Sequence, residues 1–406
     1  MRENILVIAV QNKDIDDTHF FYSMEEIKSL IETAKGTVTE VITQKRNQPH
    51  PANYLGSGKI AEVIDIIEGE NIELIIANDE LSASQMRNIQ DQTGVSVIDR
   101  SQLILDIFAS RATSNEGKLQ VELAQYQYLL PRLHGQGLAL SRLAGGIGTR
   151  GPGETKLESD RRHINRRITE LKRRLKTVIN QREQYRKRRR LNYSFNIAIV
   201  GYTNAGKSTL FNRLTESDAF EEDQLFATLD PMSRKLKLPS GLMPIITDTV
   251  GFMQDLPTEL IAAFRSTLEE VREADLIYHI VDASHPDNDQ QQQTVLDLLK
   301  DLEADHIPML TIYNKSDQLT TDFVPLLKPS LLVSAFSKTD LAKILAKTEE
   351  LIKKIWTKYD VSIPASDGKR LHQYKEHSII TDEQFIELEE VYQLQGYLPK
   401  DHPLMH

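Results

Sequence analysis

The chain has 406 residues, of which 40% are hydrophobic and 27% charged, and it contains no cysteine. At roughly 150 residues per domain, this length predicts about two to four domains with substantial cores. The lack of cysteine excludes disulfide bridges, thiolate metal sites and cysteine nucleophiles. The chain starts with an acidic residue beside a short apolar run, unlike a signal peptide, and no stretch reaches the roughly 18 apolar residues of a membrane span. We therefore expect a cytoplasmic protein without stable membrane insertion, monomeric when free.

Charge is distributed unevenly along the chain. The net charge is −10, yet residues 150–190 hold 16 Lys and Arg against 5 Asp and Glu. A concentrated basic segment in an acidic protein is typical of a contact surface for a polyanion such as nucleic acid. A solvated, charged helix is the alternative that composition leaves open.

The first 112 residues alternate apolar runs with helical stretches. Buried strands are predicted at residues 5–10, 38–43, 74–77 and 95–98, and helices at 23–34 and 58–68. This alternation predicts β/α units around a mostly parallel sheet, and therefore a small N-terminal α/β domain.

The next segment is helical. One helix face is marked by apolar residues and is expected to stop at Pro131: Leu119, Leu123, Tyr126 and Leu130. A second helix, from about residue 158 to 190, carries the spacing of a coiled-coil seam: Ile164, Ile168, Leu171, Leu175 and Val178. The two helices predict a long antiparallel hairpin.

The connection between these helices is rich in glycine and basic residues. Seven glycines fall within residues 135–153, and Arg132, Arg142, Arg150 and Lys156 lie in or beside that stretch. Because glycine lets the backbone approach closely, such a loop can hold a phosphate or enter a tight RNA pocket. An ordinary flexible surface loop is the alternative.

A phosphate-binding motif follows. The apolar run 195–200 leads directly into a G-x-x-x-x-G-K-[ST] sequence, and a helical pattern continues after it, which is the setting in which this motif binds nucleotide phosphates. We expect Lys207 to bridge the β- and γ-phosphates and the Ser208 hydroxyl to ligate Mg²⁺. The expected phosphate-binding residues are Gly201, Tyr202, Thr203, Asn204, Ala205, Gly206, Lys207, Ser208 and Thr209.

A second motif predicts the base. The apolar run 308–313 is followed by Asn-Lys-Ser-Asp, in which the Asp317 carboxylate can accept two hydrogen bonds that guanine offers and adenine does not. Asn314 is expected to brace the base and the P-loop, the Lys315 stem to cover the base, and the amides of Ser334 and Ala335 to meet the guanine carbonyl. The residues predicted at the base are Asn314, Lys315, Ser316, Asp317, Ser334, Ala335 and Phe336.

Two segments between these motifs are expected to respond to the γ-phosphate. Residues 248–251 form D-x-x-G, with Asp248 holding Mg²⁺ through water and the Gly251 N–H sensing the γ-phosphate. Thr228 is the candidate switch threonine that ligates Mg²⁺ in the triphosphate state, with an ordinary loop threonine as the alternative. The predicted metal ligands are thus Ser208 and Thr228, and the predicted catalytic residues are Lys207, Thr228 and Gly251. These segments add Phe226, Ala227, Thr228, Leu229, Asp230, Asp248, Thr249, Val250 and Gly251 to the predicted nucleotide site.

The residue after D-x-x-G is Phe252. In Ras-like proteins a glutamine in this place orients the attacking water. Phenylalanine cannot do so, and we therefore predict slow intrinsic GTP hydrolysis that a partner accelerates.

Together the patterns predict a multidomain α/β protein. Its expected parts are an N-terminal α/β domain (1–112), a long antiparallel helical hairpin with a basic glycine-rich loop (113–193), a Ras-like P-loop GTPase domain (194–359) and a small C-terminal subdomain (360–406). In the last part a turn is predicted at the Gly-Tyr-Leu-Pro sequence that starts at Gly396.

The motifs in combination resemble the HflX-type GTPases. Within the predicted GTPase domain the likeness rests on the P-loop, on residues 248–252 with Leu256-Pro257, and on residues 263–269. Outside it, the likeness rests on Tyr54-Leu-Gly-Ser-Gly-Lys59, Asp106-Ile-Phe-Ala-Ser-Arg111, residues 116–124 and residues 148–155. The resemblance implies a cytoplasmic, partly ribosome-associated GTPase that binds the large ribosomal subunit and its rRNA and dissociates stalled or idle ribosomes under stress.

Other functions stay open at this point. A GTPase of large-subunit assembly and a GTP switch regulated by a protein both fit the same motifs. The resemblance also raises ATP binding at residues 56–59, but Ile60 stands where a Mg²⁺-binding hydroxyl is needed, and a structural turn before a helix is the preferred interpretation.

Overall fold

The computed structural model describes residues 3–133, 156–191, 193–215, 226, 231–253 and 270–405. It confirms a multidomain α/β protein, which divides into two compact units. The first unit contains the described residues up to Val178, and the second contains those from Ile179 onward.

The first unit begins with a sheet of four parallel strands in the order β2-β1-β3-β4. The strands are β1 (Asn4–Asn12), β2 (Thr37–Arg46), β3 (Leu74–Ala77) and β4 (Ser96–Asp99). Four helices follow them: α1 (Asp17–Thr33), α2 (Ser57–Gly69), α3 (Ala83–Thr93) and α4 (Arg100–Arg111). Seven consecutive residues of β1 are buried, as expected for a strand in a parallel sheet covered on both faces.

Local sequence sets the ends of these helices. Ser82 and Gln85 form a capping box at the start of α3, and Gly94 ends that helix in the left-handed conformation. Residues 56–59, the segment weighed as an ATP site, form the turn into α2 with Gly56 as its N-cap. A Cβ on Gly56 would lie 2.8 Å from the guanidinium of Arg46, which is the end of a flexible side chain.

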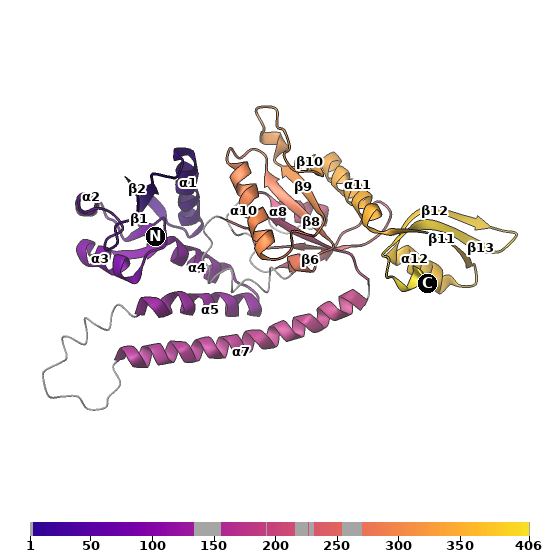
Figure 1. The fold of residues 1–406 in the computed structure, drawn as a ribbon, viewed down its shortest axis with the longest axis horizontal. Coiled ribbons are helices and arrows are strands. Elements are labelled where there is room, and N and C mark those ends of the chain that lie inside the picture. Colours follow the sequence, from indigo (N-terminus) through magenta and orange to yellow (C-terminus); the bar gives the residue numbers. More distant parts are fainter. Residues whose placement is uncertain are drawn as a thin grey trace. The chain divides into compact units, whose positions relative to one another are not determined.

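Two helices of the hairpin pack side by side and antiparallel (Figure 1), namely α5 (Asn115–Arg132) and α7 (Lys156–Leu191). Their contact contains the predicted seam residues: Leu119, Leu123, Ile168 and Leu171 are buried, with Tyr126, Leu130, Ile164, Leu175 and Val178 partly buried against them. Arg167 of α7 also pairs with Glu122 of α5 at 2.6 Å. Contrary to expectation, α5 continues one residue past Pro131, because so near a helix end the proline removes only one hydrogen bond and the Leu133 N–H still reaches the Leu129 carbonyl.

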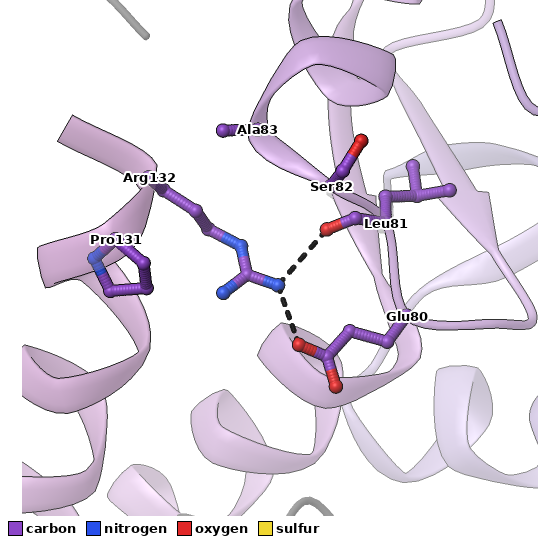
Figure 2. Close-up of a pocket in the computed structure, with 6 residues that line it drawn as sticks. All are labelled: Glu80, Leu81, Ser82, Ala83, Pro131 and Arg132. Carbon is purple, nitrogen blue, oxygen red and sulfur yellow. Dashed lines mark hydrogen bonds and ion pairs between the residues drawn. The ribbon is translucent and has the colours of Figure 1, made fainter. Parts of the chain in front are cut away.

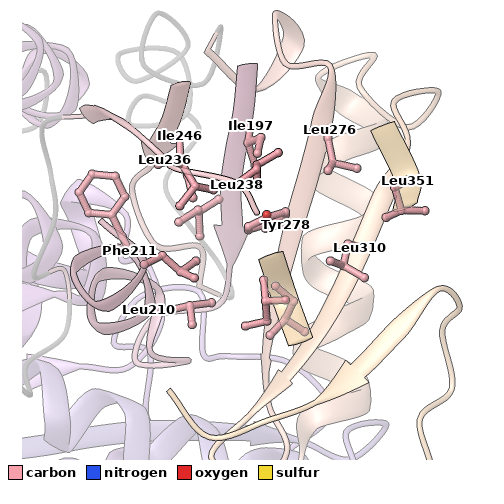
Figure 3. Packing of buried hydrophobic residues seen from close by; sticks show 14 of the residues in the cluster. Ile197, Leu210, Phe211, Leu236, Leu238, Ile246, Leu276, Tyr278, Leu310 and Leu351 are labelled. Atoms are coloured by element: carbon pink, nitrogen blue, oxygen red, sulfur yellow. The ribbon is translucent and has the colours of Figure 1, made fainter. Parts of the chain in front are cut away.

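The second unit contains a six-stranded sheet in the order β10-β9-β8-β5-β7-β6, in which β6 is antiparallel to β7 and the other pairs are parallel. The strands are β5 (Asn196–Gly201), β6 (Met232–Lys235), β7 (Ile245–Asp248), β8 (Leu276–Asp282), β9 (Met309–Asn314) and β10 (Ser330–Leu332). The helices include α8 (Lys207–Leu214), α10 (Asn288–Asp301) and α11 (Lys338–Ile355). Figure 3 shows part of the main core, to which α8 contributes Phe211, β8 contributes Tyr278 and α11 contributes Leu351.

The C-terminal subdomain is a three-stranded antiparallel sheet in the order β11-β13-β12. Its elements are β11 (Thr357–Pro364), α12 (Gly368–His377), β12 (Ile379–Ile386) and β13 (Val391–Leu398). The turn predicted at Gly396 is wrong, since that residue lies within β13. Glycine is required there because a Cβ would collide with the backbone carbonyl of Ile379 and would also lie 2.7 Å from the Tyr359 hydroxyl, so the residue permits close packing.

Candidate nucleotide-binding site

The P-loop joins β5 to α8, as the motif predicted. Gly206 is the N-cap of α8 and has a φ of +89°, and a Cβ there would collide with the side-chain amide of Asn314. Gly206 is therefore required for two reasons: its backbone is left-handed, and the Asn314 side chain approaches it too closely to leave room for a Cβ. Tyr202, Thr203, Ala205 and Lys207 are buried, whereas Asn204 is exposed.

Lys207 is held inside this loop. Its Nζ donates a hydrogen bond to the Tyr202 carbonyl at 2.7 Å. Burial lowers the pKa of Lys207 to about 8; the charge of Asp248 opposes this shift, and that of Lys315 adds to it. An anion bound beside this ammonium would favour its charged form.

The carboxyl end of β7 supplies oxygen donors. Asp248 is fully buried, and its Oδ2 accepts a hydrogen bond from the Ser208 hydroxyl at 2.8 Å. The next residue, Thr249, is fixed by a hydrogen bond from its hydroxyl to the Ile199 carbonyl at 2.6 Å. A hydroxyl and a carboxylate at adjoining positions fit the preference of Mg²⁺ for hard oxygen ligands.

The D-x-x-G segment lies directly along the P-loop. The Thr203 N–H donates to the Phe252 carbonyl at 2.6 Å, and the Phe252 N–H donates to the Gly201 carbonyl at 3.1 Å. A Cβ on Gly251 would lie 2.9 Å from Lys207 Nζ, which brings these two predicted catalytic residues together. The side chain of Phe252 is buried in the core with Val200 and others, and this burial explains how an apolar residue is accommodated after D-x-x-G.

Asn314 connects the base motif to the P-loop. Its side-chain amide donates to the Ala205 carbonyl at 3.0 Å, and its Oδ1 accepts from the Ala335 N–H at 3.0 Å. The brace between base motif and P-loop is thus present. The Ser334 N–H donates to Asp340 Oδ2 at 3.1 Å, so both amides expected at the guanine carbonyl have intramolecular acceptors in this conformation, and a guanine would have to share or replace them.

The other residues predicted at the base differ in their exposure and contacts. Asp317 is exposed in a short 3₁₀ turn, and Phe336 is 63% exposed with the Arg213 guanidinium over its ring. Lys315 has a φ of +62°, and its ammonium pairs with Asp282 at 2.7 Å. Sequence reasoning missed Asp282, because its proximity to Lys315 depends on the pairing of β8 with β9 in the sheet.

Part of the predicted site lies outside the described residues. This holds for Ala227, Thr228, Leu229 and Asp230. Their neighbour Phe226 is described and is buried with a φ of +57°. The glycine-rich stretch with Arg142 and Arg150, and the motif at residues 263–269, also lie outside the described residues.

A cavity lies where α5 ends, immediately before the glycine-rich segment (Figure 2); its lining residues are Glu80, Leu81, Ser82, Ala83, Pro131 and Arg132. The Arg132 guanidinium donates to Glu80 at 2.9 Å and to the buried carboxylate of Asp99 at 3.2 Å, and it lies 3.5 Å from the ring centre of Tyr128. Burial raises the pKa of Asp99, although the Leu81 and Gln102 amides, the Tyr128 hydroxyl and Arg132 all act against the shift. The sequence analysis grouped Arg132 with the basic loop. In the structure it instead holds the end of α5 against the N-terminal sheet, through Asp99 of β4.

Known proteins match the chain along almost its whole length. Residues 22–109 match the family model described as GTP-binding GTPase N-terminal, residues 111–189 the GTP-binding GTPase middle region, and residues 196–315 the 50S ribosome-binding GTPase. GTPase HflX of Alkalihalophilus pseudofirmus is 54% identical, over 97% of this chain and 93% of that protein. The chain belongs to the HflX family of GTPases. Its resemblance to that family, inferred from the motifs, is confirmed, and the chain is accordingly a GTP-binding enzyme that hydrolyses GTP.

More distant matches are also found. GTPase HflX of Escherichia coli is 43% identical over 79% of this chain and 73% of that protein. A crystal structure of a GTP-binding protein from Sulfolobus solfataricus in complex with GDP covers 86% of this chain and 98% of its own, at 23% identity and a TM-score of 0.45. Among the residues that the structure describes, no helix has both the length and the hydrophobicity needed to cross a membrane.

Proposed function

We propose that this GTPase binds the large ribosomal subunit and its rRNA and dissociates stalled or idle ribosomes under stress, as a cytoplasmic protein that is partly ribosome-associated. One observation carries the proposal: the basic helix α7 and the strand that ends in the P-loop are joined by only four residues, 192–195. The RNA-binding element and the nucleotide site are thus adjacent along the chain. We also propose that the chain divides into four parts, with boundaries after residues 112, 193 and 359.

The exposed side of α7 supports RNA as the target. Its seam faces α5, while seven cations within residues 161–176 are exposed: Arg161, Arg162, Arg166, Lys172, Arg173, Arg174 and Lys176. Cations along one helix bind phosphates without reading sequence, and they make affinity strongly dependent on salt. The match of residues 196–315 to a model described as a 50S ribosome-binding GTPase points to the same partner.

In the nucleotide site, the P-loop amides and Lys207 would hold the β- and γ-phosphates of GTP. Ser208 and, from the segment outside the described residues, Thr228 would ligate Mg²⁺, with Asp248 acting through water. Mg²⁺ supplies neutralisation of the charge that develops on the transferred phosphoryl group. Asp317 would select guanine by accepting its two N–H donors.

Gly251 would report the state of the nucleotide. Because it lies beside Lys207, its N–H can reach a γ-phosphate held there, and loss of that phosphate would remove the contact and free the segment. Phe252 offers no group to orient water, since its side chain has no hydrogen-bond donor or acceptor and is buried. We therefore propose slow intrinsic turnover that the ribosome accelerates.

The first test is GTP turnover with and without purified large ribosomal subunits, with Lys207→Ala as the control. Strong stimulation that the control lacks supports the proposal and leads to splitting assays on assembled ribosomes. Stimulation by immature subunits alone would favour the assembly GTPase. Tight GTP binding without stimulation would contradict ribosome activation and favour the protein-regulated switch.

A second test addresses the loop. Arg142→Ala with Arg150→Ala is expected to weaken subunit binding and leave GTP affinity unchanged. Unchanged subunit binding would show that this loop is not the anchor.

A further inference from the structure

The hairpin formed by β12 and β13, residues 379–398, has an unusual charge. It contains five carboxylates and no lysine, arginine or histidine: Asp382, Glu383, Glu387, Glu389 and Glu390. Glu383 pairs with Lys375 of α12 at 2.7 Å. Three of the carboxylates belong to the turn at residues 387–390 and are exposed. The end of this hairpin is therefore strongly acidic.

Apolar side chains are exposed among these carboxylates. Leu388 in the turn is 99% exposed, and Phe385 is 48% exposed. Phe385 pairs across the strands with Tyr392, their ring centres 4.8 Å apart, and Ile386 lies opposite Val391. An apolar group rimmed by polar residues on a surface marks an interaction site, because water-exposed apolar area is otherwise unfavourable.

The hairpin is also preorganised. β11 pairs with β13 as far as Pro364 opposite Val391, and the Ala365 N–H donates to the Glu390 carbonyl at 2.8 Å. At the other end of the hairpin, Ile379 is fully buried in the main GTPase core (the cluster of Figure 3). A surface on a rigid element loses little entropy on binding. β12 is moreover an edge strand whose residues 381–385 are all exposed.

The charge selects the class of partner. Nucleic acid and anionic membranes would be repelled by the three exposed carboxylates of the turn, and so would a second copy of the same hairpin. We propose that the end of this hairpin docks on a basic protein surface, with Leu388, Phe385 and Tyr392 entering an apolar recess and Glu387, Glu389 and Glu390 facing cations around it. The large ribosomal subunit provides a suitable probe because it contains basic proteins beside RNA. The inference itself does not require the proposed function.

The test places a photoreactive benzoylphenylalanine at position 388 of the full chain, with the same change at Val324, which is 76% exposed elsewhere in the second unit, as the matched control. Each protein is irradiated with purified large subunits and, separately, with the protein fraction extracted from them and freed of rRNA. We expect one adduct to a basic protein from position 388 in the extracted fraction, and no equivalent adduct from position 324. The variant Glu387→Lys, Glu389→Lys, Glu390→Lys should reduce its yield about tenfold or more, and the corresponding Gln variant should reduce it less.

An adduct to rRNA, an adduct to the chain itself, no adduct with either probe, or a yield that charge reversal leaves unchanged would overturn the inference. Co-sedimentation with intact subunits is measured in parallel. Co-sedimentation without the expected adduct would support the proposed function and contradict this inference. The adduct with extracted protein, without co-sedimentation, would support this inference and contradict the proposed function. Basal GTP turnover and circular dichroism check that the variants fold.

Discussion

The α5–α7 hairpin and the β12–β13 hairpin are both antiparallel elements, and they carry opposite charge. The helical hairpin buries an apolar seam between its two helices and exposes cations on α7. The β-hairpin exposes carboxylates and leaves apolar side chains at its end in water. A net charge of −10 conceals both features, because it averages them. The class of partner that each element can bind is indicated by the charges and the burial of its own residues, and not by the net charge of the chain.

The two hairpins are also attached differently. The end of α5 is held by Arg132, which reaches a fully buried carboxylate. The β-hairpin relies on apolar burial of Ile379, and its ion pair between Lys375 and Glu383 is on the surface. Loss of a buried ion pair lowers the free energy of unfolding much more than loss of an exposed one, so the two attachments can be tested separately.

The largest effect is expected from Arg132→Ala. It leaves the buried carboxylate of Asp99 without its cation, and we expect the first unit to lose about 3 kcal/mol of unfolding free energy. Urea unfolding followed by tyrosine fluorescence or circular dichroism measures this. Arg132→Lys keeps the charge and should recover part of the loss. A change within experimental error would show that the anchor is unimportant.

The stability of the second unit should depend on pH through His279, which is buried in β8. Burial lowers the pKa of this imidazole to about 4. The unfolded chain takes up the proton near pH 6.5 and the folded one only near pH 4, so stability is lost as pH falls between these values. The loss should be about 1.4 kcal/mol per pH unit, or about 2 kcal/mol at pH 5.

His279→Gln should remove that slope. Unfolding free energies of the two proteins from pH 7 to 4.5 are compared, and their difference should shift in favour of the variant on acidification. Burial and the neighbouring His377 also lower the pKa of His402, to about 4, and this residue stays in both proteins, so the difference isolates His279. Parallel curves would exclude its contribution.

Charge on α7 should govern binding to large subunits. Arg166→Ala with Arg173→Ala removes two exposed cations, and we expect about tenfold weaker binding near physiological salt, with the slope of log affinity against log salt reduced by about 1.4 to 1.8. Filter binding over a range of salt measures both. Glu387→Gln with Glu389→Gln on the β-hairpin is the comparison and should reduce the slope much less, because carboxylates release no counterions from RNA phosphates. Equal effects of the two pairs would remove the distinction between the hairpins.

The smallest effect is expected from Lys375→Ala. Its ion pair with Glu383 is partly exposed, and such pairs contribute about 1 kcal/mol at most. Thermal unfolding should shift by no more than a few degrees. A loss as large as that from Arg132→Ala would contradict the view that burial of Ile379 anchors this hairpin.

Much of the nucleotide site was predictable because its chemistry is carried by contiguous residues. A loop that wraps phosphates needs its glycines and lysine at fixed spacing, and a strand on one side and a helix on the other position it. The parallel sheets were predictable for a similar reason, since strands buried on both faces have continuous apolar runs. The seam of α5 and α7 followed from helical periodicity alone.

Contacts between distant segments were not predictable in this way. The pairing of Asp282 with Lys315, the donation from Ala335 to Asn314 and the attachment of Arg132 to Asp99 each join residues whose proximity depends on strand order. The sequence suggested that Arg132 served the RNA-binding loop and that Gly396 made a turn. Packing assigned the first to a buried carboxylate and the second to the middle of a strand.

The sequence by itself determined the family, the nucleotide motifs and the basic character of α7, because these depend on residue type and spacing along the chain. Only the tertiary structure decided which carboxylates face cations and which face water, and that Gly251 lies beside Lys207. It also revealed the acidic β-hairpin as a surface with an exposed apolar end. Burial is a property of packed elements: a buried charge with a partner, such as Asp99 with Arg132, anchors an element, whereas exposed charges beside exposed apolar side chains are available to a partner.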